Sequence, residues 1–201
     1  MSEHTQMSEL SRYLKDNDVD LINIEGHSQQ IGAQRRDLIE IVRNAKNVLE
    51  IGFNAGHSSE IFLENSSANV FSFDIGDHNY VLLGKRNLDS RFPERHTLII
   101  GDSGKTVPMF TKHSNIKFDV LFIDGNHEYD AALGDLMNCA KVAAPNAHVL
   151  FDDVVFTEDN KRSWTQGPTN AWNYMVSNYK IRHNNYSEYA AGRGMVFGQY
   201  C

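Results

Sequence analysis

Carboxylates gather after two short apolar runs in the second half of the chain. One run leads into Phe122–Tyr129 and the other into Phe151–Val154. If the two runs form neighbouring strands, Asp124, Asp152 and Asp153 converge. Close carboxylates stay ionised together only when a cation lies among them; otherwise some of them are protonated. An oxygen-liganded divalent cation such as magnesium is the natural solution. The alternative is that Asp153 caps a turn and Asp124 only contacts a cofactor.

A histidine in the first of these segments adds a group that can take up a proton. His127 follows Asp124 by three residues. Its unperturbed pKa of about 6.5 suits a general base near neutral pH. The alternative is a hydrogen bond from His127 to a neighbouring carboxylate that only orders the loop. Both interpretations remain open at this level.

A segment with two glycines follows an earlier apolar run. It reads Glu50-Ile51-Gly52-Phe53-Asn54-Ala55-Gly56, and His57-Ser58-Ser59 then begins a predicted helix. Gly52 and Gly56 allow a tight turn and a close approach of the backbone to a ligand. Asn54 stands where the dinucleotide fingerprint G-x-G-x-x-G has its second glycine, and no third glycine follows. A pyrophosphate ligand, and with it a dinucleotide oxidoreductase, is therefore disfavoured.

Two further apolar runs end in polar residues. Asp74 lies 24 residues after Glu50, where an acidic side chain can accept hydrogen bonds from both ribose hydroxyls; alternatively, it caps the following helix. Asp102 and Ser103 follow the next run, where they could contact an adenine edge. The nearby Gly-Lys-Thr imitates a phosphate loop, but that motif needs glycine where Ile99 stands, which excludes this class of ATPase.

These residues need a scaffold that brings strand ends together. Runs rich in Val, Ile and Phe, bounded by Gly, Asp or Asn, predict buried parallel strands. Segments with helical spacing alternate with them, which predicts a doubly wound α/β sheet with helices on both faces. Ligands bind such sheets at the carboxyl ends of the strands. The predicted strands are Asn47–Gly52, Val70–Asp74, Thr97–Ile100, Phe118–Asp124 and His148–Asp152.

Helices and a hairpin complete the predicted domain. The tail offers two weaker strands, which could form a closing antiparallel hairpin. They are Lys180–Asn184 and Gly194–Gly198, and the predicted helices are Gln29–Asn44, Tyr80–Ser90, Tyr129–Val142 and Thr169–Tyr179.

Composition narrows the class of protein. The chain has 201 residues with 41% hydrophobic and 22% charged, which predicts one globular domain, residues 1–201. The net charge of −7 disfavours nucleic acid and anionic lipid as partners. Cys139 and Cys201 predict neither a disulfide framework nor a zinc site, so a reducing, cytoplasmic location is expected. No apolar run approaches the roughly 18 residues that span a bilayer, and the polar, acidic beginning of the chain does not resemble a secretory signal.

Taken together, these motifs resemble the class I S-adenosylmethionine-dependent methyltransferases. The similarity is greatest to the branch of catechol and caffeoyl-CoA O-methyltransferases and related small-molecule enzymes with an Asp-Gly-x-His loop. Val48–Ser59 looks like the first motif of that family, and Phe122–Tyr129 looks like its fourth-strand motif. The similarity extends from about Ile24 to Val154, and a weaker similarity is found in Gly167–Trp172. It implies a Rossmann-like, seven-stranded, mostly parallel sheet whose last strand is antiparallel.

The resemblance also implies roles for the residues at the strand ends. Glu50 and the following loop would hold the methionine part of the cofactor, Asp74 the ribose, and Asp102 with Ser103 the adenine. Asp124 would lie beside the sulfonium. The implied cofactor-binding residues are Glu50, Gly52, Phe53, Asn54, Gly56, Ser58, Asp74, Asp102, Ser103 and Asp124; the implied metal ligands are Asp124, Asp152 and Asp153.

The sequence departs from the catechol-type pattern at two positions. The third metal ligand is typically Asn in those enzymes, whereas Asp153 stands here. The lysine often found as base has no clear counterpart, and Asn126-His127 follows the aspartate instead. We therefore expect His127 and Asp124 to act in catalysis, with His127 as the base.

The expected function is methyl transfer from S-adenosylmethionine to a hydroxyl of a small molecule, assisted by magnesium or another divalent cation. Metal-independent methylation of a nitrogen or carboxylate is one alternative, and a non-catalytic module that binds S-adenosylmethionine is another. Residues 1–28 are expected to form an N-terminal cap. A homodimer is compatible with the sequence, and neither nucleic acid nor a membrane is expected as a partner.

Overall fold

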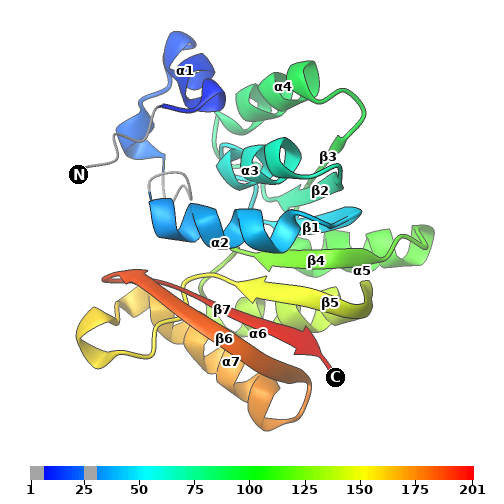
Figure 1. Ribbon diagram of the computed structural model, residues 1–201, viewed down its shortest axis with the longest axis vertical. Helices are drawn as coiled ribbons and strands as arrows, with labels where there is room; N and C mark the ends of the chain where they lie inside the picture. Colours follow the sequence, from blue (N-terminus) through cyan, green and yellow to red (C-terminus); the bar gives the residue numbers. More distant parts are fainter. Residues whose placement is uncertain (1–6, 25–30) are drawn as a thin grey trace.

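One sheet organises the chain. The computed structural model describes residues 7–24 and 31–201, and within them seven strands lie in the order β3-β2-β1-β4-β5-β7-β6 (Figure 1). The pairings β1 with β2, β1 with β4, β2 with β3 and β4 with β5 are parallel. β7 is antiparallel to both β5 and β6. The predicted mostly parallel sheet with an antiparallel end is therefore confirmed.

Most strand boundaries agree with the sequence pattern. The tail strands are longer than predicted, and β5 begins five residues early, at Ala143 rather than His148. The first residues of β5 pair Ala143 with Phe118 before a register shift. The sequence does not reveal this part of the strand, because Pro145 and Asn146, which has a positive φ, interrupt the apolar pattern. The strands are β1 Asn47–Ile51, β2 Asn69–Asp74, β3 His96–Ile100, β4 Phe118–Ile123, β5 Ala143–Phe151, β6 Ile181–Ala190 and β7 Arg193–Tyr200.

Helices cover both faces of the sheet (Figure 1). Alternate strand residues point to opposite faces, so Val120 packs with α2, α3 and α4, whereas Leu121 packs with α5, α6 and α7. Among the described residues, no helix combines the length and apolar character that a membrane crossing requires. The helices are α2 Gly32–Val42, α3 His57–Asn65, α4 Val81–Arg91, α5 Ser103–His113, α6 Tyr129–Ala140 and α7 Gln166–Ser177.

Three helices differ from the prediction. α2 is shorter than Gln29–Asn44, whose first two residues lie outside the described part of the chain. α5 is not predicted, because Gly104 and Pro108 lie in it; both residues disfavour helix interiors. α7 begins at Gln166 and includes Pro168 in its first turn, where a missing N–H costs no helical hydrogen bond.

A further helix, α1 (Glu9–Asp16), precedes the sheet. Its buried Leu10 and Leu14 pack with Ala55 of the β1–α3 loop and with Tyr80. A short 3-10 helix, η1 (Leu21–Asn23), follows it. The predicted cap, residues 1–28, is therefore described only over 7–24, and residues 1–6 and 25–28 lie outside the described part. Whether it covers a ligand stays a prediction.

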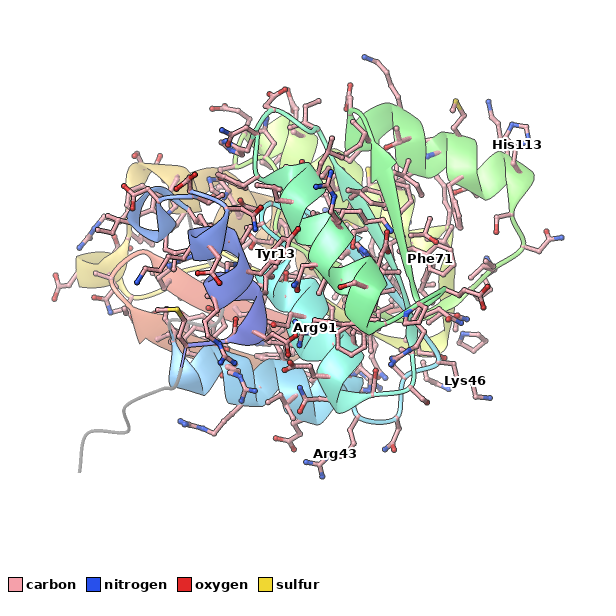
Figure 2. All side chains as sticks on the ribbon, turned by 90° about the horizontal axis from the view of Figure 1, so that it is seen from above. Tyr13, Arg43, Lys46, Phe71, Arg91 and His113 are labelled. Atoms are coloured by element: carbon pink, nitrogen blue, oxygen red, sulfur yellow. The ribbon has the colours of Figure 1, made fainter. Side chains whose placement is uncertain are left out.

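Arg91 joins α1 to α3 and α4. Its guanidinium contacts Glu60 at 2.6 Å, Glu64 at 2.5 Å and Glu9 at 3.4 Å. In Figure 2, Arg91 lies between the ribbon of α1 and that of α3. The carboxylate of Glu60 is fully buried and also accepts the backbone N–H of Leu10 at 2.9 Å. One arginine therefore holds the N-terminal helix on the elements that follow β1 and β2.

Candidate active site

The loop after β1 approaches the end of β4 more closely than any side chain would allow. Gly52 has a φ of +89°, and a Cβ at this position would lie 1.8 Å from the carbonyl oxygen of Asp124. Gly56 ends the loop with a φ of +94°, and its Cβ would lie 2.7 Å from the ring of Phe53. Both glycines are therefore required by the backbone, which brings the loop and Asp124 to the same point.

Glu50 is a fully buried carboxylate beneath this loop. It accepts hydrogen bonds from the hydroxyls of Ser58, Ser59 and Ser72, the latter two at 2.5 Å. Burial raises the pKa of Glu50, the three hydroxyls lower it, and the charge of Asp74 raises it. The side chain of Glu50 therefore ties the start of α3 to β1 and β2.

Phe53 also faces the interior. Its side chain is 1% exposed and stacks on His96 with ring centroids 5.0 Å apart. Burial and the nearby Lys85 lower the pKa of His96 to about 3, so this histidine is neutral in the folded protein. The backbone of Phe53, rather than its ring, is thus what the loop can offer a ligand.

Asp74 lies at the end of β2, next to the loop. One carboxylate oxygen accepts the backbone N–H of Asn54 at 2.8 Å, and the other accepts that of Gly76 at 2.7 Å. Asn54 itself has a φ of +52°, which an asparagine tolerates better than most residues. Asp74 therefore fixes the middle of the loop and remains partly exposed.

Asp102 and Ser103 lie at the end of β3. Asp102 caps α5 by accepting the backbone N–H of Gly104 at 2.9 Å, and its other oxygen contacts Lys105 at 3.0 Å. These two interactions lower the pKa of Asp102. Ser103 hydrogen-bonds to Asp135 of α6, whose pKa burial raises to about 6. The exposed Asp102 and the anchored Ser103 thus border the same edge of the sheet.

Three potential ligands converge beyond β4 and β5. One ligand atom from each of Asp124, His127 and Asp153 can be chosen so that all lie within 4.8 Å of one another. His127 Nε2 lies 2.9 Å from Asp153 Oδ2. Asp153 has a φ of +57°, so its side chain leaves the direction that the strand would give it. We name these three residues the Asp-His-Asp group.

Asp152 lies next to this group but has a different environment. It is 2% exposed, and its Oδ2 accepts a hydrogen bond from Nε2 of Gln34 in α2 at 2.7 Å. Burial and the charges of neighbouring aspartates raise the pKa values of Asp124 and Asp152, whereas Arg193 lowers them. Such mutual repulsion favours protons or a cation among the carboxylates.

Several buried oxygens in this region are left without a hydrogen-bond partner. Among the described residues, Asp152 Oδ1, Asp153 Oδ1 and Gln34 Oε1 have none. A buried polar atom without a partner costs about 1–3 kcal/mol. Within residues 7–24 and 31–201, these oxygens therefore remain available to a further hydrogen-bond donor or to a cation.

The segment between β5 and α7 frames the site. Val154 N–H donates to Gly194 at 3.0 Å, and Gly192 N–H donates to Asn160 at 2.7 Å. A Cβ on Gly167 would lie 2.0 Å from the carbonyl oxygen of His127, so the first turn of α7 abuts the loop of the Asp-His-Asp group. A polar pocket of about 320 Å³ is lined by Glu158, Lys161, Thr165, Gln166, Thr169 and Asn170.

Three residues near the site have no signal in the sequence. Gln34 lies in the middle of a helix, and only the fold brings α2 to the end of β5. Asp135 follows Asp124 by eleven residues, and its burial beside Ser103 depends on how α6 packs against α5. Arg193 stands in the tail hairpin and reaches the carboxylates because β7 lies beside β5. Each contact depends on tertiary packing.

Solved structures with this fold define the class of protein. An O-methyltransferase from Bacillus cereus in complex with SAH matches with a TM-score of 0.77 and 18% identity, over 100% of this chain and 92% of that chain. The O-methyltransferase TomG from Streptomyces achromogenes, in complex with SAM, matches with a TM-score of 0.73 and 16% identity over 100% and 91%. The N-methyltransferase NodS from Bradyrhizobium japonicum WM9, in complex with SAH, gives 0.65 and 12% over 95% and 96%. The fold is that of the class I S-adenosylmethionine-dependent methyltransferases.

The sequence itself identifies the family. The family model described as a methyltransferase domain matches residues 49–154, which is more than half of the chain. The chain therefore belongs to the methyltransferase domain family and is an S-adenosylmethionine-dependent methyltransferase. A search of curated protein sequences finds no significant match.

Proposed function

We propose that this methyltransferase acts on a hydroxyl of a small molecule with the help of a divalent cation. The observation that carries the proposal is the Asp-His-Asp group, which lies where the loop after β1 meets Asp124. Methylation of a hydroxyl requires removal of its proton as the new bond forms, and this group offers carboxylates, an imidazole and a possible cation site for that purpose.

The cofactor is assigned to the strand ends on either side of β1. S-adenosylmethionine supplies, when bound, a methyl group activated by its sulfonium. The loop with Gly52 and Gly56 offers its backbone to the methionine part, Asp74 accepts from the ribose hydroxyls, and Asp124 lies beside the sulfonium. Support for these roles comes from the shared edge of the sheet and from the close approach of the loop to Asp124. The assigned residues are Glu50, Gly52, Phe53, Asn54, Gly56, Ser58, Asp74, Asp102, Ser103 and Asp124, with Glu50 and Ser58 acting by ordering the loop.

The residues present fit a divalent cation. Repelling carboxylates and the buried, unpartnered Oδ1 atoms of Asp152 and Asp153 support this assignment. The predicted ligands are Asp124, Asp152 and Asp153, and the Asp-His-Asp group offers His127 as well. A bound cation supplies a Lewis acid that lowers the pKa of a coordinated hydroxyl. Magnesium is the predicted ion, and other divalent cations fit the same charges.

The proton of the acceptor can leave by two routes that use the same residues. In the first, Asp153 orients His127 through Nε2, and the imidazole accepts the proton at Nδ1 as a general base. In the second, the carboxylates and His127 hold the cation, and the acidified hydroxyl needs a weaker base. A chelator distinguishes the two routes, because only the second depends on a metal.

Binding of the cofactor is the first test. Titration calorimetry with S-adenosylmethionine and S-adenosylhomocysteine should give micromolar affinity in the wild type. Asp74→Ala should lower this affinity at least tenfold, since a hydrogen bond to a charged group contributes about 1.5–3 kcal/mol. Asp77→Ala removes an exposed carboxylate three residues away and serves as the matched control. Equal affinities in the two variants would contradict the role of Asp74.

An acceptor screen tests the reaction. Transfer of labelled methyl groups to panels of small hydroxyl, amine and carboxylate compounds should favour hydroxyls and should stop with a chelator. The same fold occurs in the N-methyltransferase NodS, so metal-independent methylation of amines or carboxylates is the alternative outcome. A protein that binds the cofactor but methylates none of the panels would instead fit a non-catalytic binding module.

The net charge and the cysteines support a type of acceptor and a cellular compartment for the reaction. The net charge of −7 supports a small-molecule acceptor rather than nucleic acid or an anionic membrane. Cys139 is buried, Cys201 is exposed, and both are free thiols, which supports a reducing cytoplasm. A homodimer is compatible with this arrangement, and light scattering would establish the oligomeric state.

A further inference from the structure

We infer that His127 is a ligand of the divalent cation and that the resulting nitrogen-containing site prefers Mn²⁺, Co²⁺ or Zn²⁺ to Mg²⁺. The inference deepens the proposed function and rests on it for the role of the cation in methyl transfer. Binding of the ion itself can be measured without any acceptor. The inference also chooses between the two routes for the proton, because an imidazole that binds a cation through one nitrogen carries its proton on the other nitrogen and has no lone pair left to act as a base.

The first argument is the position of the ligand atoms. The Asp-His-Asp group places one nitrogen and two carboxylate oxygens within 4.8 Å of one another. Ligand atoms at about 2.0–2.2 Å from one ion lie at most about 4.4 Å apart. Small side-chain rotations therefore suffice to bring the three ligand atoms within binding distance of one ion. The 2.9 Å contact between His127 Nε2 and Asp153 Oδ2 shows that the imidazole already faces the carboxylate.

The second argument is the buried oxygen of Asp153. The residue is 5% exposed, and its Oδ1 has no hydrogen-bond partner among the described residues, although Oδ2 accepts from His127. Hydrogen bonding inside the group therefore leaves a carboxylate oxygen unsatisfied. A cation bound by Asp153 would compensate its charge, which a hydrogen bond to His127 does only in part.

The third argument concerns Asp152, which the family resemblance implied as a ligand. Its Oδ2 is held at 2.7 Å by Gln34 Nε2, and no Asp152 atom belongs to the converging set. Both residues follow the end of β5 at Phe151, and the left-handed backbone of Asp153 turns its side chain in another direction than that of Asp152. The Oδ1 atom of Asp152, like that of Asp153, is unpartnered within the described part of the chain, but Asp152 lies outside the converging set, so we assign it to the surroundings of the site, where its charge acts without direct ligation.

The ligand chemistry determines the preferred metal. Magnesium demands oxygen ligands in octahedral geometry and dehydrates reluctantly. Imidazole suits zinc, copper, iron and nickel, and affinity for nitrogen-containing sites rises from Mn²⁺ to Co²⁺ and beyond. One imidazole with two carboxylates therefore favours transition metals, and Mg²⁺ can use only the carboxylates well.

Metal titrations of the full chain after removal of ions with a chelator test this inference. Calorimetry with Mg²⁺, Mn²⁺, Co²⁺ and Zn²⁺ and the visible spectrum of bound Co²⁺ report binding without turnover. The wild type should bind Co²⁺ and Zn²⁺ at least tenfold more tightly than Mg²⁺. His127→Ala should weaken Co²⁺ and Zn²⁺ at least tenfold and change Mg²⁺ less than threefold. His113→Ala, at the exposed C-terminal end of α5 (Figure 2), should match the wild type.

Two aspartate variants complete the design. Asp153→Asn should weaken every ion at least tenfold, whereas Asp152→Asn should keep Co²⁺ binding within about threefold. The inference is overturned if His127→Ala binds Co²⁺ like the wild type, or if Mg²⁺ binds more tightly than Co²⁺. Unchanged affinity for S-adenosylhomocysteine shows that each variant is folded. The metal site would be refuted if the wild type bound S-adenosylhomocysteine but none of the four ions. That result would favour metal-independent methyl transfer.

Discussion

Asp135 gives the sharpest test of the packing beside the site. It is 2% exposed in α6, and burial raises its pKa from 3.8 to about 6 despite a hydrogen bond from Ser103. The folded chain therefore holds this proton more tightly than the unfolded chain does. The resulting stabilisation is fully present below pH 3.8 and is lost as the pH rises through about 6.

The perturbation is Asp135→Asn, which imitates the neutral carboxyl and can still accept from Ser103. Each pKa unit corresponds to about 1.36 kcal/mol, so the change from 3.8 to about 6 amounts to about 3 kcal/mol. The variant should match the wild type near pH 4 and be up to about 3 kcal/mol more stable at pH 7.5. For a domain of this size, that raises the Tm by roughly 6–12 °C.

Urea denaturation from pH 4 to pH 7.5 provides the assay. The difference between variant and wild type is the relevant quantity, because the other titrating groups contribute equally to both. Asp130→Asn removes a charge from the exposed first turn of the same helix and controls for effects of helix charge. A difference that does not depend on pH, or a wild type at least as stable at pH 7.5, would refute the burial of an ionisable Asp135.

Further substitutions test other parts of the fold. Arg91→Met should lower the free energy of unfolding in urea by about 3 kcal/mol, because it leaves the buried carboxylate of Glu60 without the guanidinium. Adding Glu60→Gln should recover part of this loss, and no recovery would show that the unpaired carboxylate is not its cause. Gly52→Ala should abolish calorimetric binding of S-adenosylhomocysteine, because its Cβ would lie 1.8 Å from a backbone oxygen, and wild-type affinity would show that the loop does not approach β4. Gly134→Ala should stabilise the folded protein by about 0.5–1 kcal/mol, because nothing in the described chain lies within 4 Å of the added Cβ. Gly167→Ala should destabilise the protein despite the same gain in helix propensity, because its Cβ would clash with the His127 carbonyl. Thermal unfolding measures both changes, and a rise in Tm for both variants would contradict the contact at Gly167.

The sheet could be predicted because its strands are local signals. Val120–Ile123, for example, is a run of apolar residues that ends in Asp124, and burial on both faces requires that pattern. α1 and α5 escape such reasoning for different reasons. α1 is mostly polar and is held by packing on Ala55 and Tyr80, and α5 contains Pro108.

The site was predictable only to the level of which strand ends meet. The sequence predicted that Asp124, Asp152 and Asp153 would converge, because they follow neighbouring strands, whereas the converging ligand atoms belong to Asp124, His127 and Asp153. The separate environments of Asp152 and Asp153 were not predicted, because adjacent residues differ here through one backbone dihedral, the φ of +57° at Asp153. Gln34 reaches Asp152 from 118 positions away in sequence, a distance over which a single sequence carries no pairing signal.

The segment between β5 and α7 has a consequence for protein engineering. It is fixed at Val154 and Asn160 by backbone hydrogen bonds to the tail hairpin, and Gly167 in the first turn of α7, just beyond it, abuts the His127 carbonyl. Exchanging the whole segment for that of another enzyme would replace Asp153 together with both anchored positions, and so would dismantle the Asp-His-Asp group. A library that varies only residues lining the polar pocket, such as Lys161 and Asn170, leaves Asp153 and both hydrogen-bonded positions in place.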